Sequence, residues 1–239
     1  MIRQPNDPTS IGAAAPAEGG ATPLSLAEIE TLGMKAARGA GLSWGMAEEA
    51  GMAARWLAAH RLPGPELLLR HLESFDRRAW RAVAPIVGAR IWRTDDGAAL
   101  CPLAAGAALS DRAGLADGPG ARPITLEPVA DPGLLLPFAA LAARGLGRPL
   151  RIAWNGMVAV VAAAGVAFEA DERSVMDATA ARVVIEPAAP PAALRGAEAA
   201  PRRVPLAVWQ GLDRLAFRTY VPASEASRAG AGAGTTDND

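Results

Sequence analysis

The stretch at residues 25–62, SLAEIETLGMKAARGAGLSWGMAEEAGMAARWLAAHRL, carries the strongest local structural signals in this chain. Ser25 stands three residues before Glu28, the spacing of a capping box, in which each side chain satisfies a backbone N–H at the other's position. A helix is therefore expected to begin at Leu26. The triplet GAG at residues 39–41 then supplies residues that readily adopt the left-handed conformation found at helix ends.

A second helix is predicted directly after this triplet, over residues 44–60. Ser43 is a suitable N-cap, and the Leu-Pro-Gly run at residues 62–64 is typical of a helix end. Because the connection between the two helices is only a few residues long, the helices are expected to pack side by side as an αα-hairpin.

Polar and small residues share one face of this second helix. Trp44, Glu48, Gly51 and Arg55 recur at the helical spacings i, i+4, i+7 and i+11. Glycine within a helix costs about 1 kcal/mol relative to alanine, so we expect another helix or a ligand to approach Gly51 closely. Glu48 and Arg55 are about 10 Å apart along the axis and are predicted to bracket a polar guest. The alternative is that Gly51 makes room for a packed helix and the charges are solvated or paired with neighbouring elements.

Two runs in the chain resemble a known protein family. They are ETLGMKAARGAGLSWGMAEEAG at residues 30–51 and RTYVPASEASRAGAGAGTTDND at residues 218–239. They are similar to a bacterial, mostly proteobacterial, family known only as a domain of unknown function, and the resemblance extends over about residues 25–239. Because that family has no assigned activity, the resemblance implies no mechanism and no catalytic residue.

The charge composition excludes one large class of function. The chain of 239 residues has 24 basic and 25 acidic residues, for a net charge of -1, and these are spread along the sequence. A nucleic-acid-binding domain would show a basic patch or stripe. No nucleic-acid partner is therefore predicted.

Cysteine content and hydropathy indicate the compartment. Cys101 is the only cysteine, so neither an intramolecular disulfide nor a zinc site with several cysteines is expected. No apolar run reaches the length of a membrane span, and residues 1–23 lack the charged start and apolar block of a signal peptide. A cytoplasmic protein that does not bind membranes is predicted.

The first half of the chain is predicted to be mostly helical. Residues 1–23 indicate a disordered leader, and a third helix is expected to begin at Pro65 and to end near Val83. His71 is interpreted as a partly buried helix residue. Residues 90–102 predict a short hairpin around a Thr-Asp-Asp-Gly turn. Cys101 would end its second strand, and it is interpreted as a small buried hydrophobe because nothing nearby in the sequence supplies a base.

The second half of the chain is predicted to contain most of the strands. A strand is expected at residues 124–128, a helix interrupted by Pro137 at residues 134–143, and a hairpin at residues 150–161, where Asn-Gly separates two apolar runs. Another strand is expected at residues 182–186, then an Ala/Pro-rich linker at residues 187–205 and a closing helix near residues 206–217.

These elements predict an α+β fold: a helical hairpin and a third helix packed on a largely antiparallel sheet, then a closing helix and a flexible Gly-rich tail. Residues 24–220 would form a single domain, preceded by the leader at residues 1–23 and followed by the tail at residues 221–239.

The candidate site residues come from the second helix and from the tail. We expect a pocket between the helical hairpin and the sheet, where Glu48 acts as acid or base, Arg55 holds an anionic substrate, and Asp111 contributes a further carboxylate. Trp44 and Arg38 are predicted ligand contacts. In the tail, six polar residues are predicted to bind a ligand or partner: Ser224, Glu225, Ser227, Arg228, Asp237 and Asp239.

Two functions stay open from the sequence. The first is a small-molecule enzyme or ligand-binding protein of bacterial metabolism that acts on a polar or anionic metabolite. The second is a non-catalytic accessory or interaction protein that docks through its C-terminal tail on a protein partner or on a second copy of itself. The chain contains no nucleotide-binding motif and no paired-histidine metal motif, so no cofactor is assigned.

Overall fold

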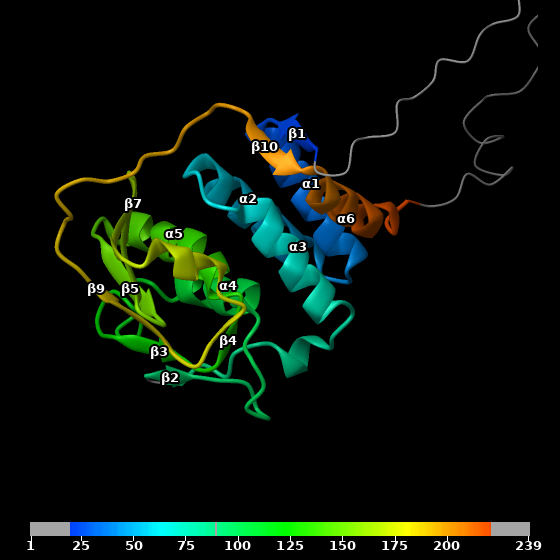
Figure 1. The fold of residues 1–239 in the computed structure, drawn as a ribbon. Helices are drawn as coiled ribbons and strands as arrows, with labels where there is room; N and C mark the ends of the chain where they lie inside the picture. The colour runs from blue at the N-terminus through cyan, green and yellow to red at the C-terminus, as the bar shows by residue number, and fades with distance from the viewer. Residues whose placement is uncertain (1–19, 89, 221–239) are drawn as a thin grey trace, which may run out of the picture.

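The computed structural model describes residues 20–88 and 90–220 (Figure 1). Four helices pack together on one side of the molecule, and a larger sheet forms the opposite side. The four helices are α1 (Leu26–Gly39), α2 (Trp44–Ala59), α3 (Gly64–Phe75) and α6 (Leu206–Phe217). The expected αα-hairpin is therefore present, because α1 and α2 are neighbours that pack along their lengths.

The larger sheet has six strands in the order β2-β3-β9-β5-β6-β7. Only β2 and β3 run parallel, and every other neighbouring pair is antiparallel. The strands are β2 (Ile91–Trp92), β3 (Ile124–Leu126), β5 (Leu150–Trp154), β6 (Met157–Ala162), β7 (Gly165–Ala170) and β9 (Val183–Pro187). The predicted α+β class with a largely antiparallel sheet is confirmed.

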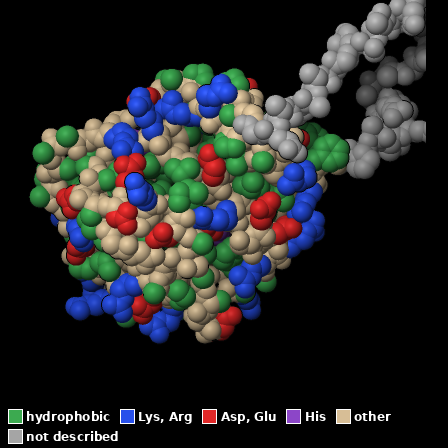
Figure 2. All heavy atoms as spheres, viewed as in Figure 1, with side chains coloured by type: hydrophobic (Ala, Val, Ile, Leu, Met, Phe, Trp, Pro, Cys, Tyr) green, Lys and Arg blue, Asp and Glu red, His purple; other side chains and the backbone are tan. Residues whose placement is uncertain are grey.

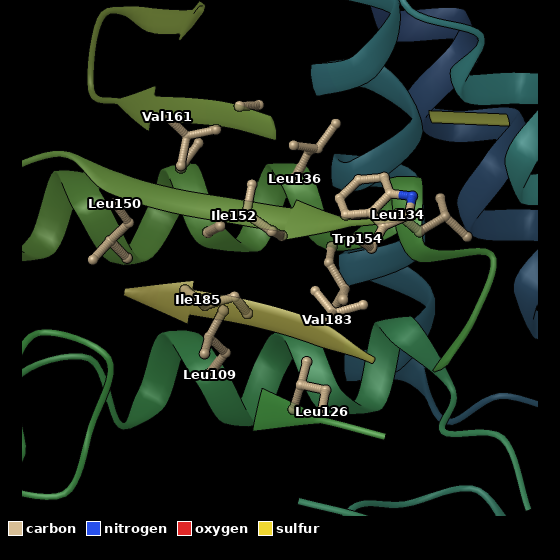
Figure 3. Close-up of a cluster of buried hydrophobic side chains, with 14 of the residues drawn as sticks. Leu109, Leu126, Leu134, Leu136, Leu150, Ile152, Trp154, Val161, Val183 and Ile185 are labelled. Carbon is tan, nitrogen blue, oxygen red and sulfur yellow. The ribbon is translucent and has the colours of Figure 1, made fainter. Parts of the chain in front are cut away.

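Two helices, α4 (Pro102–Asp111) and α5 (Leu136–Leu146), lie between the helical side and the sheet (Figure 1). The side chains of β5 alternate between buried and half-buried, so one face of the sheet is apolar and packs on these helices. Figure 3 shows the resulting core, in which Ile152 and Trp154 of β5 lie beside Leu136 of α5, and Ile185 lies beside Leu109 of α4.

Short elements complete the chain. Three 3-10 helices are η1 (Trp80–Ala82), η2 (Pro132–Leu135) and η3 (Glu172–Met176), and two further strands, β4 (Val129–Ala130) and β8 (Thr179–Ala180), pair with each other. None of the helices in the described ranges combines the length and the apolar character that crossing a bilayer requires.

The strand β1 (Ala21–Leu24) corrects one predicted boundary. It pairs antiparallel with β10 (Arg202–Pro205), so residues 21–23, which we assigned to the leader, belong to a two-stranded sheet. The same pairing gives regular structure to the end of the predicted linker at residues 187–205. Neither strand is visible in its local sequence because each is fixed by a partner about 180 residues away along the chain. The predicted division into one domain, a leader and a tail otherwise stays a prediction.

The Asn-Gly hairpin is confirmed. Strands β5 and β6 pair antiparallel with Trp154 opposite Met157, and Asn155 and Gly156 form the two-residue turn with φ angles of 44° and 87°. Positive φ at both positions is what a type I′ turn requires, and asparagine and glycine tolerate it best.

The hairpin predicted at residues 90–102 is wrong. The turn itself forms, because the Thr94 hydroxyl donates to the Ala98 carbonyl at 2.7 Å and the Ala98 N–H donates to Asp96 at 3.0 Å. The two arms nevertheless separate: β2 joins β3 in parallel, and Pro102 begins α4. Proline is favoured in the first turn of a helix, where its missing N–H costs nothing.

Two predicted helix boundaries also change. The third helix ends at Phe75, because the next residues turn away and the Arg77 N–H donates to the Ala40 carbonyl at 2.9 Å, a contact with the end of α1. Pro137 does not interrupt a helix. It lies in the first turn of α5, where proline is tolerated.

A close approach between α1 and α2 explains the glycine within α2. A Cβ atom placed on Gly51 would lie 2.5 Å from the Glu30 carbonyl oxygen and 3.2 Å from the Met34 Cβ. Gly51 is buried by this contact. The helix-packing interpretation of Gly51 is therefore correct, and α1 is the element that approaches it.

Alanine substitutions at two glycines of α2 are expected to change stability in opposite directions. Gly51→Ala should lower the free energy of unfolding by about 1–2 kcal/mol, because the new methyl group meets α1 backbone that must move. Gly45→Ala is the matched control: nothing lies within 4 Å of its Cβ position, and alanine should stabilise the helix by up to about 1 kcal/mol. Urea denaturation of both variants measures the difference, and equal stability of the two would contradict the packing account.

Candidate functional site

Three buried side chains from distant parts of the chain meet between α3 and α4. His71 Nε2 lies 3.2 Å from Cys101 Sγ, and His71 Nδ1 lies 3.0 Å from Asp131 Oδ2. The exposed fractions of His71, Cys101 and Asp131 are 1%, 6% and 3%. We call these three residues the thiol triad, since the imidazole links the sulfur to the carboxylate.

Each member of the thiol triad is positioned by the secondary structure around it. His71 lies on the buried face of α3 and stacks on Phe75, with ring centroids 4.4 Å apart. Cys101 is the residue immediately before α4, and its backbone N–H donates to the Val83 carbonyl at 3.0 Å. Asp131 precedes η2 in a left-handed conformation, with φ 44° and ψ 55°.

The position of Cys101 at the start of a helix favours its thiolate form. Burial raises the pKa of the Cys101 thiol, but the charge of His71, the hydrogen bond to His71 and the backbone N–H groups of Ala104 and Leu103 outweigh burial. The resulting pKa lies below its usual range. Lowered thiol pKa values at helix N-termini beside a histidine are typical of reactive cysteines.

His71 is correspondingly stabilised in its protonated form. Burial lowers the pKa of His71, but the Cys101 charge and the hydrogen bonds to Asp131 and Cys101 raise this pKa to about 9. The two shifts have one cause, because a thiolate and an imidazolium in contact each stabilise the charged form of the other. The lowered pKa of Cys101 and the raised pKa of His71 both favour a thiolate-imidazolium pair.

Asp131 is held by a second cation, the guanidinium of Arg70. Arg70 Nε donates to Asp131 Oδ1 at 2.6 Å, and its two terminal nitrogens donate to the carbonyls of Met176 and Asp177 at 2.8 and 2.9 Å. Each Asp131 oxygen therefore accepts from a different side chain. This arrangement fixes the carboxylate, which in turn requires His71 to carry its Nδ1 proton and to present Nε2 to the sulfur.

The arrangement can support nucleophilic catalysis. A thiolate can attack an electrophilic carbon, the imidazolium can return a proton to the leaving group, and the carboxylate keeps the imidazole in the required tautomer. Across residues 20–88 and 90–220, no group of three or more His, Cys, Asp and Glu side chains is arranged to hold a metal ion.

The sequence interpretation of Cys101 missed its base. His71 and Asp131 are each 30 residues away along the chain, in opposite directions, so no local motif joins them to Cys101. The burial of Cys101 was predicted correctly. One usable signal was the Cys-Pro pair before an apolar run, because proline in a first turn places the preceding residue at a helix N-terminus.

The predicted residues Glu48 and Arg55 lie elsewhere, in an open groove beside α2. Both line this groove, but Arg55 NH1 donates to Glu30 at 2.6 Å, so its charge is already paired. Arg55 is therefore held by α1. Their assigned roles as acid or base and as anion holder stay predictions.

Trp44, Arg38 and Asp111 are not brought together with this pair. The Arg38 guanidinium lies 4.6 Å from the centre of the Trp44 ring and donates to the Leu42 carbonyl, so the two residues flank the turn between α1 and α2. Asp111 is the last residue of α4 and contributes to the electrostatic environment of Glu49. The predicted tail residues Ser224, Glu225, Ser227, Arg228, Asp237 and Asp239 lie outside the described residues.

Alkylation of the single cysteine should report the thiolate directly. The rate of alkylation by iodoacetamide should decrease as the pH is lowered. The midpoint of this decrease is expected below about pH 8.5, the pKa of an ordinary thiol. In His71→Gln the midpoint should move above that value, because burial still raises the thiol pKa and no imidazolium opposes it. Glu73→Gln, on the exposed side of the same helix, is the control. An unchanged midpoint in His71→Gln would contradict the ion pair.

The pKa values of the two histidines, measured by NMR, should be shifted in opposite directions from the ordinary histidine value. We expect His71 to lose its proton near pH 9 in the native protein. In Cys101→Ala its pKa should fall, because the main raising influence is gone while burial remains. Burial lowers the pKa of His60, so His60 should titrate below the usual value in both proteins and serve as an internal reference. A His71 pKa that Cys101→Ala leaves unchanged would show that the thiol is un-ionised.

Comparison with known proteins gives a match to one family model and indicates no activity. No curated protein and no solved structure matches the chain. Residues 24–98 match the family described as "Protein of unknown function (DUF3726)". The match includes the first of the two runs on which the resemblance was based, together with α1, α2, α3 and His71, and it ends before Cys101. Over residues 24–98, the chain is therefore similar to this family of proteins of unknown function.

Proposed function

We propose that this protein is a cysteine-dependent enzyme that transfers or hydrolyses the acyl group of a small molecule. One observation carries the proposal: the Cys101 sulfur, the His71 imidazole and the Asp131 carboxylate lie in hydrogen-bond contact in that order. A merely buried cysteine requires only apolar neighbours, whereas this one faces a base that is itself oriented by a carboxylate.

The proposed reaction has two steps. The Cys101 thiolate attacks the acyl carbon, a carbon-sulfur bond forms, the bond to the leaving group breaks, and His71 gives its Nε2 proton to that group. His71, now neutral, takes a proton from water, which attacks the thioester. The carboxylic acid leaves and the thiol triad returns to its first state. An acceptor other than water would give acyl transfer.

The first turn of α4 can stabilise the negative charge of both transition states. Backbone N–H groups at the start of a helix have no partner within the helix. Those of Leu103 and Ala104 lie close enough to Cys101 to lower its pKa. Donors beside a nucleophile in a site with little water are suited to an oxyanion formed on the attacked carbonyl.

Burial of the site supports a small substrate. With 6% of Cys101 exposed, a narrow electrophile can reach the sulfur more readily than a folded polypeptide can. The polar or anionic metabolite expected from the sequence fits this size class. Because a thiol nucleophile has to stay reduced, the bacterial cytoplasm is the compartment in which we expect this activity to serve small-molecule metabolism.

The alternative, an accessory protein that docks through the C-terminal tail, concerns residues that lie outside the described ranges. An accessory role would also leave the thiolate-imidazolium pair without a use, although burying charged groups is costly. We therefore favour the enzyme. A protein partner or a homo-oligomer remains compatible with it.

Acylation by para-nitrophenyl acetate tests the proposal. We expect a burst of nitrophenolate equal to the protein concentration, with an acetyl group on Cys101 in the intact mass. His71→Gln should slow acylation about 10²–10⁴-fold through loss of proton transfer. Cys101→Ser should lose the thioester adduct, while Glu73→Gln should behave as the native protein. The proposal would be overturned if only residues other than Cys101 were acylated. Equal acylation rates in the native protein and in His71→Gln would also overturn it.

A further inference from the structure

An open groove runs along α2 on the side that faces α5, with a volume of about 890 Å³. Its walls are completed by residues 162–164, in the turn after β6, and by residues 197–199, before β10. Figure 2 shows apolar side chains gathered in the region between α2 and α5, with acidic and basic side chains around them. Cys101 and His71 are not among the residues that line the groove.

The middle of the groove is apolar. Met52 and Trp56 from α2 face Ala140 and Leu141 from α5, and 41% of the Leu141 surface is exposed. An apolar surface of this kind gains free energy when an aliphatic chain covers it.

One end of the groove carries carboxylates without a counter-ion. Glu48 and Glu49 line it, and neither forms an ion pair with any cation of the described residues. Burial raises the pKa of Glu49, and the charges of Asp111 and Glu48 raise it further. Like charges gathered beside an apolar surface destabilise one another, and an ammonium group placed among them would relieve this repulsion.

The other acidic side chains of the groove are already compensated. Glu30 is paired with Arg55 at 2.6 Å. Glu198 is paired with Arg61 at 2.7 Å and lies 3.6 Å from Arg202. These pairs leave Glu48 and Glu49 as the acidic side chains of the groove that are free to bind a cation.

An unpaired cation lies toward the opposite end. The Ser110 hydroxyl donates to the Phe138 carbonyl at 3.2 Å, so the start of α5 lies against the end of α4 and near Glu49. Arg144 follows Phe138 by six residues, about 9 Å further along the helix axis. It lines the groove, and no carboxylate of residues 20–88 or 90–220 pairs with it. The groove therefore has a negative end and a positive end.

A buried imidazole adds an acceptor to the groove. His60 is 3% exposed, and its Nδ1 donates to the Trp56 carbonyl at 2.7 Å. Nε2 then carries a lone pair, and no partner for it is present among the described residues. Burial lowers the pKa of His60, so the ring is neutral at pH 7. A neutral Nε2 that lines a groove can accept a hydrogen bond from an amide or amine of a ligand.

We propose that this groove binds a linear zwitterion, whose ammonium group contacts Glu48 and Glu49, whose aliphatic chain covers Met52 and Trp56, and whose carboxylate contacts Arg144. This ligand class is the one that pairs both sets of free charges and covers the apolar surface between them. A simple diamine would leave Arg144 without a partner, and a dicarboxylate would meet the acidic end. The proposal is independent of the thiol chemistry at Cys101.

Phe138, which lies beside the acidic end, and Arg144 are about 9 Å apart along α5, and this offset sets the approximate length of the ligand. An amino acid with its amine at the far end of an alkyl chain spans such a distance, and so does a peptide of about three residues, at 3.3–3.6 Å per residue. Both carry the same two charges. A peptide would in addition donate backbone N–H groups to His60 Nε2.

Isothermal titration calorimetry with four probes tests the proposal. They are octanoate with a terminal amino group, octylamine, octanoate and trialanine. The amino-octanoate should bind about tenfold or more tightly than octylamine or octanoate, because each of these lacks one charge-assisted contact. Tighter binding of trialanine than of the amino-octanoate would assign a peptide, and the reverse would assign a free amino acid. Octylamine binding as tightly as both zwitterions would overturn the proposal.

Variants connect each charge of the ligand to its partner. Arg144→Gln should reduce the affinity for the zwitterion about tenfold while leaving octylamine binding the same or tighter, a pattern that misfolding cannot produce. The double variant Glu48→Gln, Glu49→Gln should bind the zwitterion no better than octanoate. Glu169→Gln, an exposed change on β7, is the control.

Cys101→Ser separates this proposal from the proposed enzyme. It should bind the zwitterion with native affinity although it has lost the thioester adduct. Absence of zwitterion binding in a native protein that still forms the acetyl adduct would overturn the groove proposal alone. Retention of the zwitterion preference in Arg144→Gln would also overturn it.

Discussion

Asp131 joins the helical side of the molecule to the segment between β7 and β9 of the sheet. Its two oxygens accept from Arg70 and His71 of α3, and its backbone N–H donates to the Ala178 carbonyl at 2.8 Å. Loss of one partner of such a buried charge commonly costs 3–5 kcal/mol, which about equals the lower limit of a domain's total stability. The orientation of His71, and through it the ionisation of Cys101, therefore depends on a contact that also holds the layers together.

Two polar regions of this molecule differ in how their charges are balanced. Around the thiol triad, Asp131 contacts the Arg70 guanidinium and Cys101 contacts the His71 imidazole, so the buried polar atoms face one another. Such a network is stable without a ligand, and its reactivity resides in one sulfur. In the groove beside α2, no cation of the described residues pairs with Glu48 or Glu49, and this imbalance is the basis of the proposed ligand. The proposed chemistry and the proposed recognition therefore lie at different places in the same fold.

The sequence predicted those parts of the fold and of the site that are fixed by contacts within about a dozen residues. The capping box of Ser25 and Glu28 forms with both of its hydrogen bonds, and Asn155 and Gly156 close the expected hairpin. The placement of Glu48 and Arg55 on one groove-facing side of α2 follows from helical spacing alone. The pairing of Arg55 with Glu30 could not be foreseen in this way, because it depends on how α1 and α2 are rotated against each other.

The sequence by itself determined the presence of α1, α2, α3, α5 and α6, the principal turns, the α+β class and the presence of a single cysteine, because propensity, capping and hydrophobic period act locally. Only the tertiary structure decided that Cys101 meets His71 and Asp131, that β1 pairs with β10, and that the arms around the Thr-Asp-Asp-Gly turn part into a parallel strand pair and a helix. These features join residues 30 to 180 positions apart. Their partners are selected by the burial of apolar faces, which fixes where each element packs and thereby which polar side chains are brought into contact.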